Sequence, residues 1–125
     1  MLILARSICD LSFSRLMEVY IEGNLENAEE FYTDLTEGQK LIQAEQDFYQ
    51  YLNEVFFRTS DAVYAIWEEQ GTYVSALRLE PYRDGLLLEA LETAPPSRRQ
   101  GYAEKLMLAV LDCFGGTKIY SHVSK

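Results

Sequence analysis

The segment from Leu86 to Phe114 constrains the fold more than any other part of the chain. It begins with an apolar strand, passes a kink at Pro95–Pro96, and ends in a helix whose apolar residues recur at intervals of three and four. The start of such a helix leaves backbone N–H groups without partners, and with the positive end of the helix dipole they suit a phosphate. Gly101 lets the turn approach a ligand closely, while Arg98 and Arg99 add positive charge.

The turn Arg98–Ala103 resembles the R/Q-x-x-G-x-G/A loop of the GNAT superfamily, the acetyl-CoA-dependent N-acetyltransferases. Upstream, Leu91, Thr93 and Pro95 stand where that family has an apolar residue, the residue that faces the thioester, and the proline before the loop. The resemblance is specific from about residue 72 to residue 123, and before that it rests on the order of elements. The other interpretation is that Gly101 only relieves a turn and that the arginines are solvated.

The resemblance implies an α/β (α+β) fold, in which a mixed, mainly antiparallel sheet is flanked by helices in the order β-α-α-β-β-β-α-β. The length fits a single domain over residues 1–125. In the family the chain continues past the fifth strand, with a fourth helix and further strands. This sequence is therefore expected to correspond to the N-terminal two thirds of the usual domain.

Hydrophobic spacing and turn residues divide the rest of the chain. A strand is predicted over Leu2–Ala5, followed by a helix from Phe13 that Gly23–Asn24 should end. The acidic stretch Leu25–Leu35 is interpreted as a loop or a short helix. Thr36–Gln39 has the form of a capping box and begins a second helix.

Three further strands are predicted beside the organising one. Residues 62–67 and 72–80 form two of them, joined by a hairpin turn at Gln70–Gly71. Gly115–Gly116 stops the third helix, and Lys118–Val123 is the last strand. Alternation in the strand 72–80 places four side chains on one face: Tyr73, Ser75, Leu77 and Leu79.

The resemblance implies a set of coenzyme-binding residues. The loop amides would hold the pyrophosphate of acetyl-CoA, and the preceding strand would offer backbone groups to the pantetheine arm and the thioester oxygen. The residues expected to bind the coenzyme are Leu91, Glu92, Thr93, Arg98, Arg99, Gln100, Gly101, Tyr102 and Ala103.

Two carboxylates of the organising strand, Glu89 and Glu92, are candidates for the base that takes a proton from the acceptor ammonium. In a regular strand they point to opposite faces, so at most one faces the acceptor, and a bulge would change which one. The alternative for each is an exposed or structural carboxylate. Ser121–His122 does not qualify as a nucleophilic pair, since neighbouring strand residues face opposite ways.

The acidic stretch supplies the candidates for substrate binding, which are Glu29, Glu30 and Tyr32. The family places the loop between its first two helices over the substrate, so these residues would line the acceptor site. The alternative is a solvated acidic face with anchoring aromatic residues.

The charge balance limits the partners. With 11 basic and 20 acidic residues the formal net charge is −9, which argues against nucleic acid and permits an amine substrate. No apolar run is long enough for a membrane span, and the start of the chain does not read as a signal peptide. The two cysteines are far apart, lack metal-binding spacing, and are interpreted as reduced core thiols. These observations predict a cytoplasmic protein.

The predicted function is transfer of the acetyl group of acetyl-CoA to a primary amine, on a small molecule or a peptide, by direct attack in a ternary complex. The rival is a non-catalytic acyl-CoA-binding or interaction module, which the short C-terminal part favours. On the same ground we expect coenzyme binding with little turnover unless another chain completes the site. We also expect a homo-oligomer that covers the last strand. A different phosphate binder lacks support, because neither G-x-x-x-x-G-K-S/T nor a clear G-x-G-x-x-G occurs.

Overall fold

A five-stranded sheet forms the centre of the protein in the computed structural model, which describes residues 1–121 apart from the side chains of residues 25, 27 and 28. The strand order is β1-β2-β3-β4-β5. The first four strands pair antiparallel and β5 pairs parallel with β4. The strands are β1 (Leu2–Ala5), β2 (Val63–Glu69), β3 (Thr72–Tyr82), β4 (Gly85–Thr93) and β5 (Lys118–Ser121). The predicted fold class and element order are confirmed.

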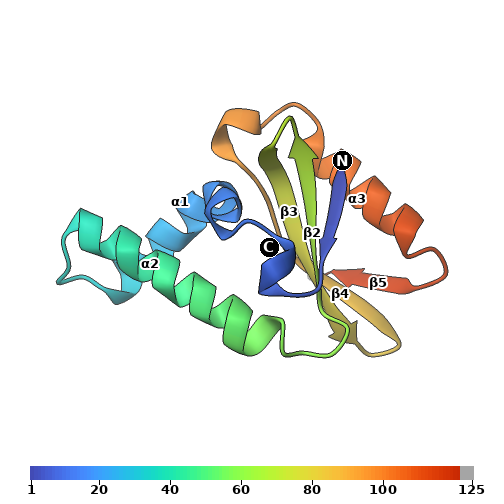
Figure 1. Ribbon diagram of the computed structural model, residues 1–125, viewed down its shortest axis with the longest axis horizontal. Helices are drawn as coiled ribbons and strands as arrows, with labels where there is room; N and C mark the ends of the chain where they lie inside the picture. The colour runs from blue at the N-terminus through green and yellow to red at the C-terminus, as the bar shows by residue number, and fades with distance from the viewer. Residues whose placement is uncertain (122–125) are drawn as a thin grey trace.

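Helices cover both faces of the sheet (Figure 1). On one face lie α1 (Phe13–Phe31) and α2 (Glu37–Tyr51), and α2 continues into a π-helical turn, η2 (Leu52–Phe56). The capping box that was predicted for α2 is present, because the Thr36 hydroxyl accepts from the Gln39 N–H and the Gln39 side chain accepts from the Thr36 N–H. The core of this layer joins Tyr20 of α1, Phe48 of α2 and Tyr64 of β2.

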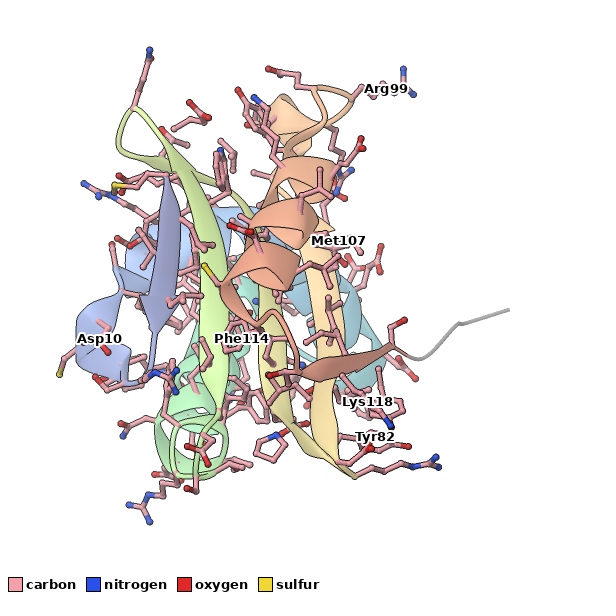
Figure 2. The ribbon with its side chains drawn as sticks, turned by 90° about the vertical axis from the view of Figure 1, so that its right-hand side faces the viewer. Asp10, Tyr82, Arg99, Met107, Phe114 and Lys118 are labelled. Carbon is pink, nitrogen blue, oxygen red and sulfur yellow. The ribbon has the colours of Figure 1, made fainter. Side chains whose placement is uncertain are left out.

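The other face of the sheet is covered by α3 (Tyr102–Cys113) (Figure 2). Its fully buried residues Leu106 and Val110 pack against Leu77 and Leu79 of β3, and Phe114 packs against the edge of the same cluster. Two short 3-10 turns, η1 (Ile8–Asp10) and η3 (Pro95–Ser97), lie in the connections. The η3 turn leads from β4 to the loop that precedes α3.

The first helix is longer than the sequence predicts. The prediction that Gly23–Asn24 ends it is wrong, because α1 continues through this pair to Phe31 and absorbs most of the acidic stretch. A glycine inside a helix costs only about 1 kcal/mol relative to alanine. Contacts between α1 and α2, such as the Tyr20 and Phe48 rings 5.5 Å apart, offset that cost.

The face assignment of β3 is also corrected. Leu77 and Leu79 face α3, as does Ser75 by register, but Tyr73 belongs to the cluster on the α1 side. The cause is a β-bulge at Val74, since Ser75 pairs with Trp67 while Tyr73 pairs with the next residue of β2, Glu68. The displaced Tyr73 hydroxyl accepts a hydrogen bond from the Ser12 N–H at the start of α1.

The parallel pairing of β4 with β5 begins at a close approach of two backbones. A Cβ on Gly85 would lie 2.1 Å from the carbonyl oxygen of Lys118, so only glycine fits opposite that residue. The adjacent Asp84 carboxylate binds the ammonium of Lys118 at 2.8 Å and the hydroxyl of Tyr120. Both partners stabilise the charged carboxylate, with Lys118 the stronger, and they lower the pKa of Asp84.

The two cysteines depart from the sequence interpretation. Cys9 and Cys113 are both exposed, so neither is a core thiol.

Candidate functional site

The loop before α3 is shaped by two residues in the left-handed backbone region. Arg99 has a φ of 65° and Gly101, the N-cap of α3, has a φ of 78°. The Lys105 N–H donates to the Gly101 carbonyl at 3.0 Å, so the N–H groups of the three residues before Lys105 precede the first intrahelical bond. A Cβ on Gly101 would meet no heavy atom within 4 Å, so the loop is open on that side. Unbonded N–H groups at the start of a helix suit an anion.

The two arginines of the loop differ in their surroundings. Arg98 forms an ion pair with Glu22 of α1 at 2.8 Å, and its Nε donates to the Thr93 carbonyl at 3.3 Å. Arg98 therefore ties the loop to the end of β4 and to α1. Both arginines are exposed, and Arg99 projects from the tip of the loop (Figure 2). Tyr102 is at the first position of α3, and the Lys105 Nζ lies over its ring, 5.4 Å from the ring centre.

A second bulge interrupts β4 beside this loop. Arg78 and Ala76 of β3 pair with Glu89 and Glu92, so two residues of β4, Ala90 and Leu91, oppose a single residue of β3. Arg78 and Ala76 share a face, and so do their partners. Glu89 and Glu92 therefore point to the same face. The opposite directions expected of a regular strand do not apply, because β4 contains the bulge that was named as the exception.

The bulge is held from α1. Ala90 lies in the left-handed region with a φ of 54°, and the Tyr20 hydroxyl donates to its carbonyl at 2.6 Å. Burial, together with the nearby Tyr64, raises the pKa of Tyr20 well above its ordinary value. The Tyr20 hydroxyl consequently keeps its proton and remains a donor to the bulge.

A pocket of about 440 Å³ opens over the bulge, between β3, β4, α1 and α2. Its lining combines aromatic rings with a few ionisable groups. Among the residues predicted for the site it includes Glu92 and Tyr32, whereas Glu29 and Glu30 are exposed and do not line it. The lining residues are Tyr20, Gly23, Asn24, Phe31, Tyr32, Ala44, Asp47, Phe48, Tyr51, Arg78, Ala90 and Glu92.

Tyr32 lies at the outer wall of this pocket. Its hydroxyl donates to Asp47 at 2.9 Å, and this hydrogen bond raises the pKa of Tyr32. Asp47 also accepts from Gln43 at 2.9 Å. The outer wall thus presents a fixed carboxylate.

Three residues of the site carry roles that sequence reasoning missed. Arg78 enters the pocket from β3, and its Nε lies 3.8 Å from the Glu89 carboxylate. Ser75, fully buried, donates to the Glu92 carbonyl at 2.9 Å. Glu22 holds Arg98. A polar residue within the apolar alternation of β3 is the signal that could have drawn attention to Ser75 and Arg78.

Some of the residues discussed from the sequence lie outside the part of the chain that the structure describes. These are His122 and the end of the strand predicted over Lys118–Val123. Within residues 1–121, no group of three His, Cys, Asp or Glu side chains could hold a metal ion. Over the same residues, every helix is too short or too polar to cross a bilayer.

The chain resembles known proteins in sequence and in fold. The sequence profile of the acetyltransferase (GNAT) family matches residues 16–125. Among solved structures, a GNAT-family acetyltransferase from Streptococcus pneumoniae TIGR4 superposes with a TM-score of 0.59 at 14% identity, covering 100% of this chain and 76% of its own. The PaiA N-acetyltransferase of Thermoplasma acidophilum, in complex with coenzyme A, superposes with a TM-score of 0.57 at 14% identity. The superposition covers 90% of this chain and 71% of the PaiA chain.

An aminoglycoside N-acetyltransferase in complex with coenzyme A is a further structural neighbour, with a TM-score of 0.52 at 15% identity. The superposition covers 99% of this chain and 76% of that enzyme. At these identities the structures establish a shared fold. A comparison with curated proteins gives no significant match.

Proposed function

The chain belongs to the GNAT family of acetyltransferases, with acetyl-CoA as the cosubstrate, and on this premise we propose that it acetylates a primary amine by direct attack in a ternary complex. The observation that carries this proposal is that β4 adjoins both halves of the site. Thr93 accepts a hydrogen bond from Arg98 of the loop, and its neighbour Glu92 lines the pocket. A donor held at the loop and an acceptor held in the pocket would meet at this strand.

The coenzyme half of the proposal rests on residues 98–103. The unpaired amides at the start of α3 and the exposed cation of Arg99 suit the diphosphate of acetyl-CoA. The bulge at Ala90–Leu91 takes backbone groups out of the ladder with β3, where they can bind the pantetheine arm and the thioester oxygen. Gln100 and Ala103 complete the loop around Gly101.

The acceptor half places the amine in the pocket beside Glu92. This carboxylate accepts a proton from the ammonium group, either directly or through water, and leaves a neutral amine. Asp47 and Tyr32 form the outer wall along which a cation enters. Glu89 is the less suitable base, because its carboxylate lies against Arg78 and does not line the pocket.

The reaction then proceeds in one complex. The amine nitrogen attacks the thioester carbonyl carbon, a C–N bond forms, and the tetrahedral oxyanion is stabilised by backbone N–H groups of the strand. Collapse breaks the C–S bond, the nitrogen gives up its second proton, and the thiolate takes a proton to leave as coenzyme A.

A thiol-release assay tests this function. Acetyl-CoA is incubated with the protein and a panel of polyamines, aminoglycosides and amino acids, and free thiol is followed with time. We expect release that depends on the amine and an acetylated product detectable by mass spectrometry. Coenzyme binding by calorimetry with no turnover on any amine would favour the non-catalytic binding module instead.

A homo-oligomer across β5 is proposed as well, on the ground that β5 is one of the two edge strands of the described sheet. A second copy could pair with its outer backbone groups. We expect light scattering at high protein concentration to give the mass of a dimer or a larger assembly. A monomer mass throughout the concentration series would contradict this proposal.

A further inference from the structure

We infer that the acceptor amine also carries a carboxylate, which the Arg78 guanidinium binds inside the pocket. This inference rests on the proposed function and narrows it to amino acids and short peptides that present a free carboxyl group. It begins from the charge of the pocket, which contains a cation although the chain carries a net charge of −9. A site for polyamines would gain nothing from a guanidinium on its floor.

The Arg78 side chain lies among aromatic residues. It is 19% exposed, and its guanidinium carbon lies 5.0 Å from the centre of the Tyr51 ring and 6.0 Å from that of Phe56. Within residues 1–121 its buried Nε has no hydrogen-bond partner. Contact with these two rings holds the guanidinium at the wall of the pocket, where a ligand can approach it.

The Glu89 carboxylate does not form a hydrogen bond with the Arg78 Nε. At 3.8 Å from Nε it lies beyond hydrogen-bond distance, although it compensates part of the charge. Glu89 is also shared with Glu80, since a hydrogen bond between the two carboxyl groups and partial burial raise the pKa of Glu80. A largely buried guanidinium with an unsatisfied Nε–H is costly, and a carboxylate is the ligand that fits a guanidinium best.

The strand register sets the distance between this anchor and the proposed base. Arg78 pairs with Glu89, and Ala76, two residues along β3, pairs with Glu92. Two residues of a strand span about 7 Å on one face. An amine and a carboxylate separated by a few bonds on one molecule can therefore reach Glu92 and Arg78 together. A second cation in place of the carboxylate would be repelled by Arg78.

The test compares each amino acid with its own amide in the thiol-release assay. L-alanine, 4-aminobutyrate and a glutamate-containing dipeptide are each paired with the corresponding carboxamide, and spermidine serves as a polycation. For the wild type we expect kcat/KM to be at least tenfold higher for the best acid than for its amide. Equal values for acid and amide, or a preference for spermidine, would overturn the inference.

Variants of Arg78 test whether this residue causes the preference for amino acids over their amides. Arg78→Gln should bring the ratio of acid to amide close to one, and Arg78→Lys should give an intermediate ratio because it keeps the charge and loses the planar fork. The matched control is Arg83→Gln, at the exposed turn between β3 and β4, which should keep the wild-type ratio. An unchanged ratio in Arg78→Gln would overturn the assignment to Arg78.

Two outcomes separate this inference from the proposed function. Turnover of amides and spermidine at rates equal to the acids would leave the acetyltransferase proposal standing and remove the inference. Absence of turnover on every amine would remove both. If Arg78→Gln does not fold, the wild-type comparison of acids with amides decides by itself.

Discussion

Gly101→Glu should weaken the binding of coenzyme A by more than a hundredfold. The new carboxylate would be attached at the N-cap of α3, next to the N–H groups where the diphosphate is proposed to bind, and like charges repel. The substitution also places a side chain on a residue with a φ of 78°, which strains the loop. Isothermal titration calorimetry with coenzyme A measures the change.

Strain alone must be separated from the loss of the anion site. Gly116→Glu is the matched control, because Gly116 has a φ of 87° and equally open surroundings but follows the far end of α3. This variant should keep wild-type affinity for coenzyme A even if it unfolds at a lower temperature. Equal affinities for wild type and Gly101→Glu would show that the diphosphate does not bind at this loop.

Glu92→Gln should lower kcat/KM for the best amine by about a hundredfold or more, which is the contribution of one general base. The amide has nearly the shape of the carboxylate, so the pocket and the pairing of Glu92 with Ala76 should persist. Because a neutral amine no longer needs the base, the deficit should shrink as the pH rises toward the pKa of the free amine. Initial rates from pH 6 to about pH 10 measure this.

Two other variants sharpen the assignment. Glu89→Gln decides between the two carboxylates of β4, and we expect it to reduce activity less than Glu92→Gln does. Glu45→Gln, on the exposed side of α2, controls for the loss of one negative charge and should match the wild type. If Glu92→Gln and Glu45→Gln have the same rates, Glu92 is not the base.

Sequence patterns correctly predicted the features that depend on a few neighbouring residues. The capping box at Thr36 and the turn at Gln70–Gly71 each depend on a few neighbouring residues, and both appear as predicted. The strand, turn and helix from Leu86 to Phe114 were also found, because apolar spacing and one glycine determine them. That segment was sufficient to indicate the family.

The parts that failed depend on contacts distant in sequence. Packing of α1 on α2 carries the helix through Gly23, and no local pattern reports that packing. The bulges at Val74 and Ala90 appear only once the register with the neighbouring strand is known. Sequence periodicity alone therefore could not predict the sheet face to which Tyr73, Glu89 and Glu92 point. The place of Arg78 in the pocket follows from the same register.

The bulge at Ala90 has a consequence for how the chain can vary in length. A deletion of Ala90 would leave Glu89 opposite Arg78 and Glu92 opposite Ala76, so both carboxylates would keep their face. The deletion would instead return Leu91 to the ladder and remove the carbonyl that Tyr20 holds. The extra residue in the bulge thus provides backbone groups that do not pair with β3, and it does not set the face to which Glu89 and Glu92 point. A substitution at Ala90 can keep these backbone groups, whereas a deletion of Ala90 cannot.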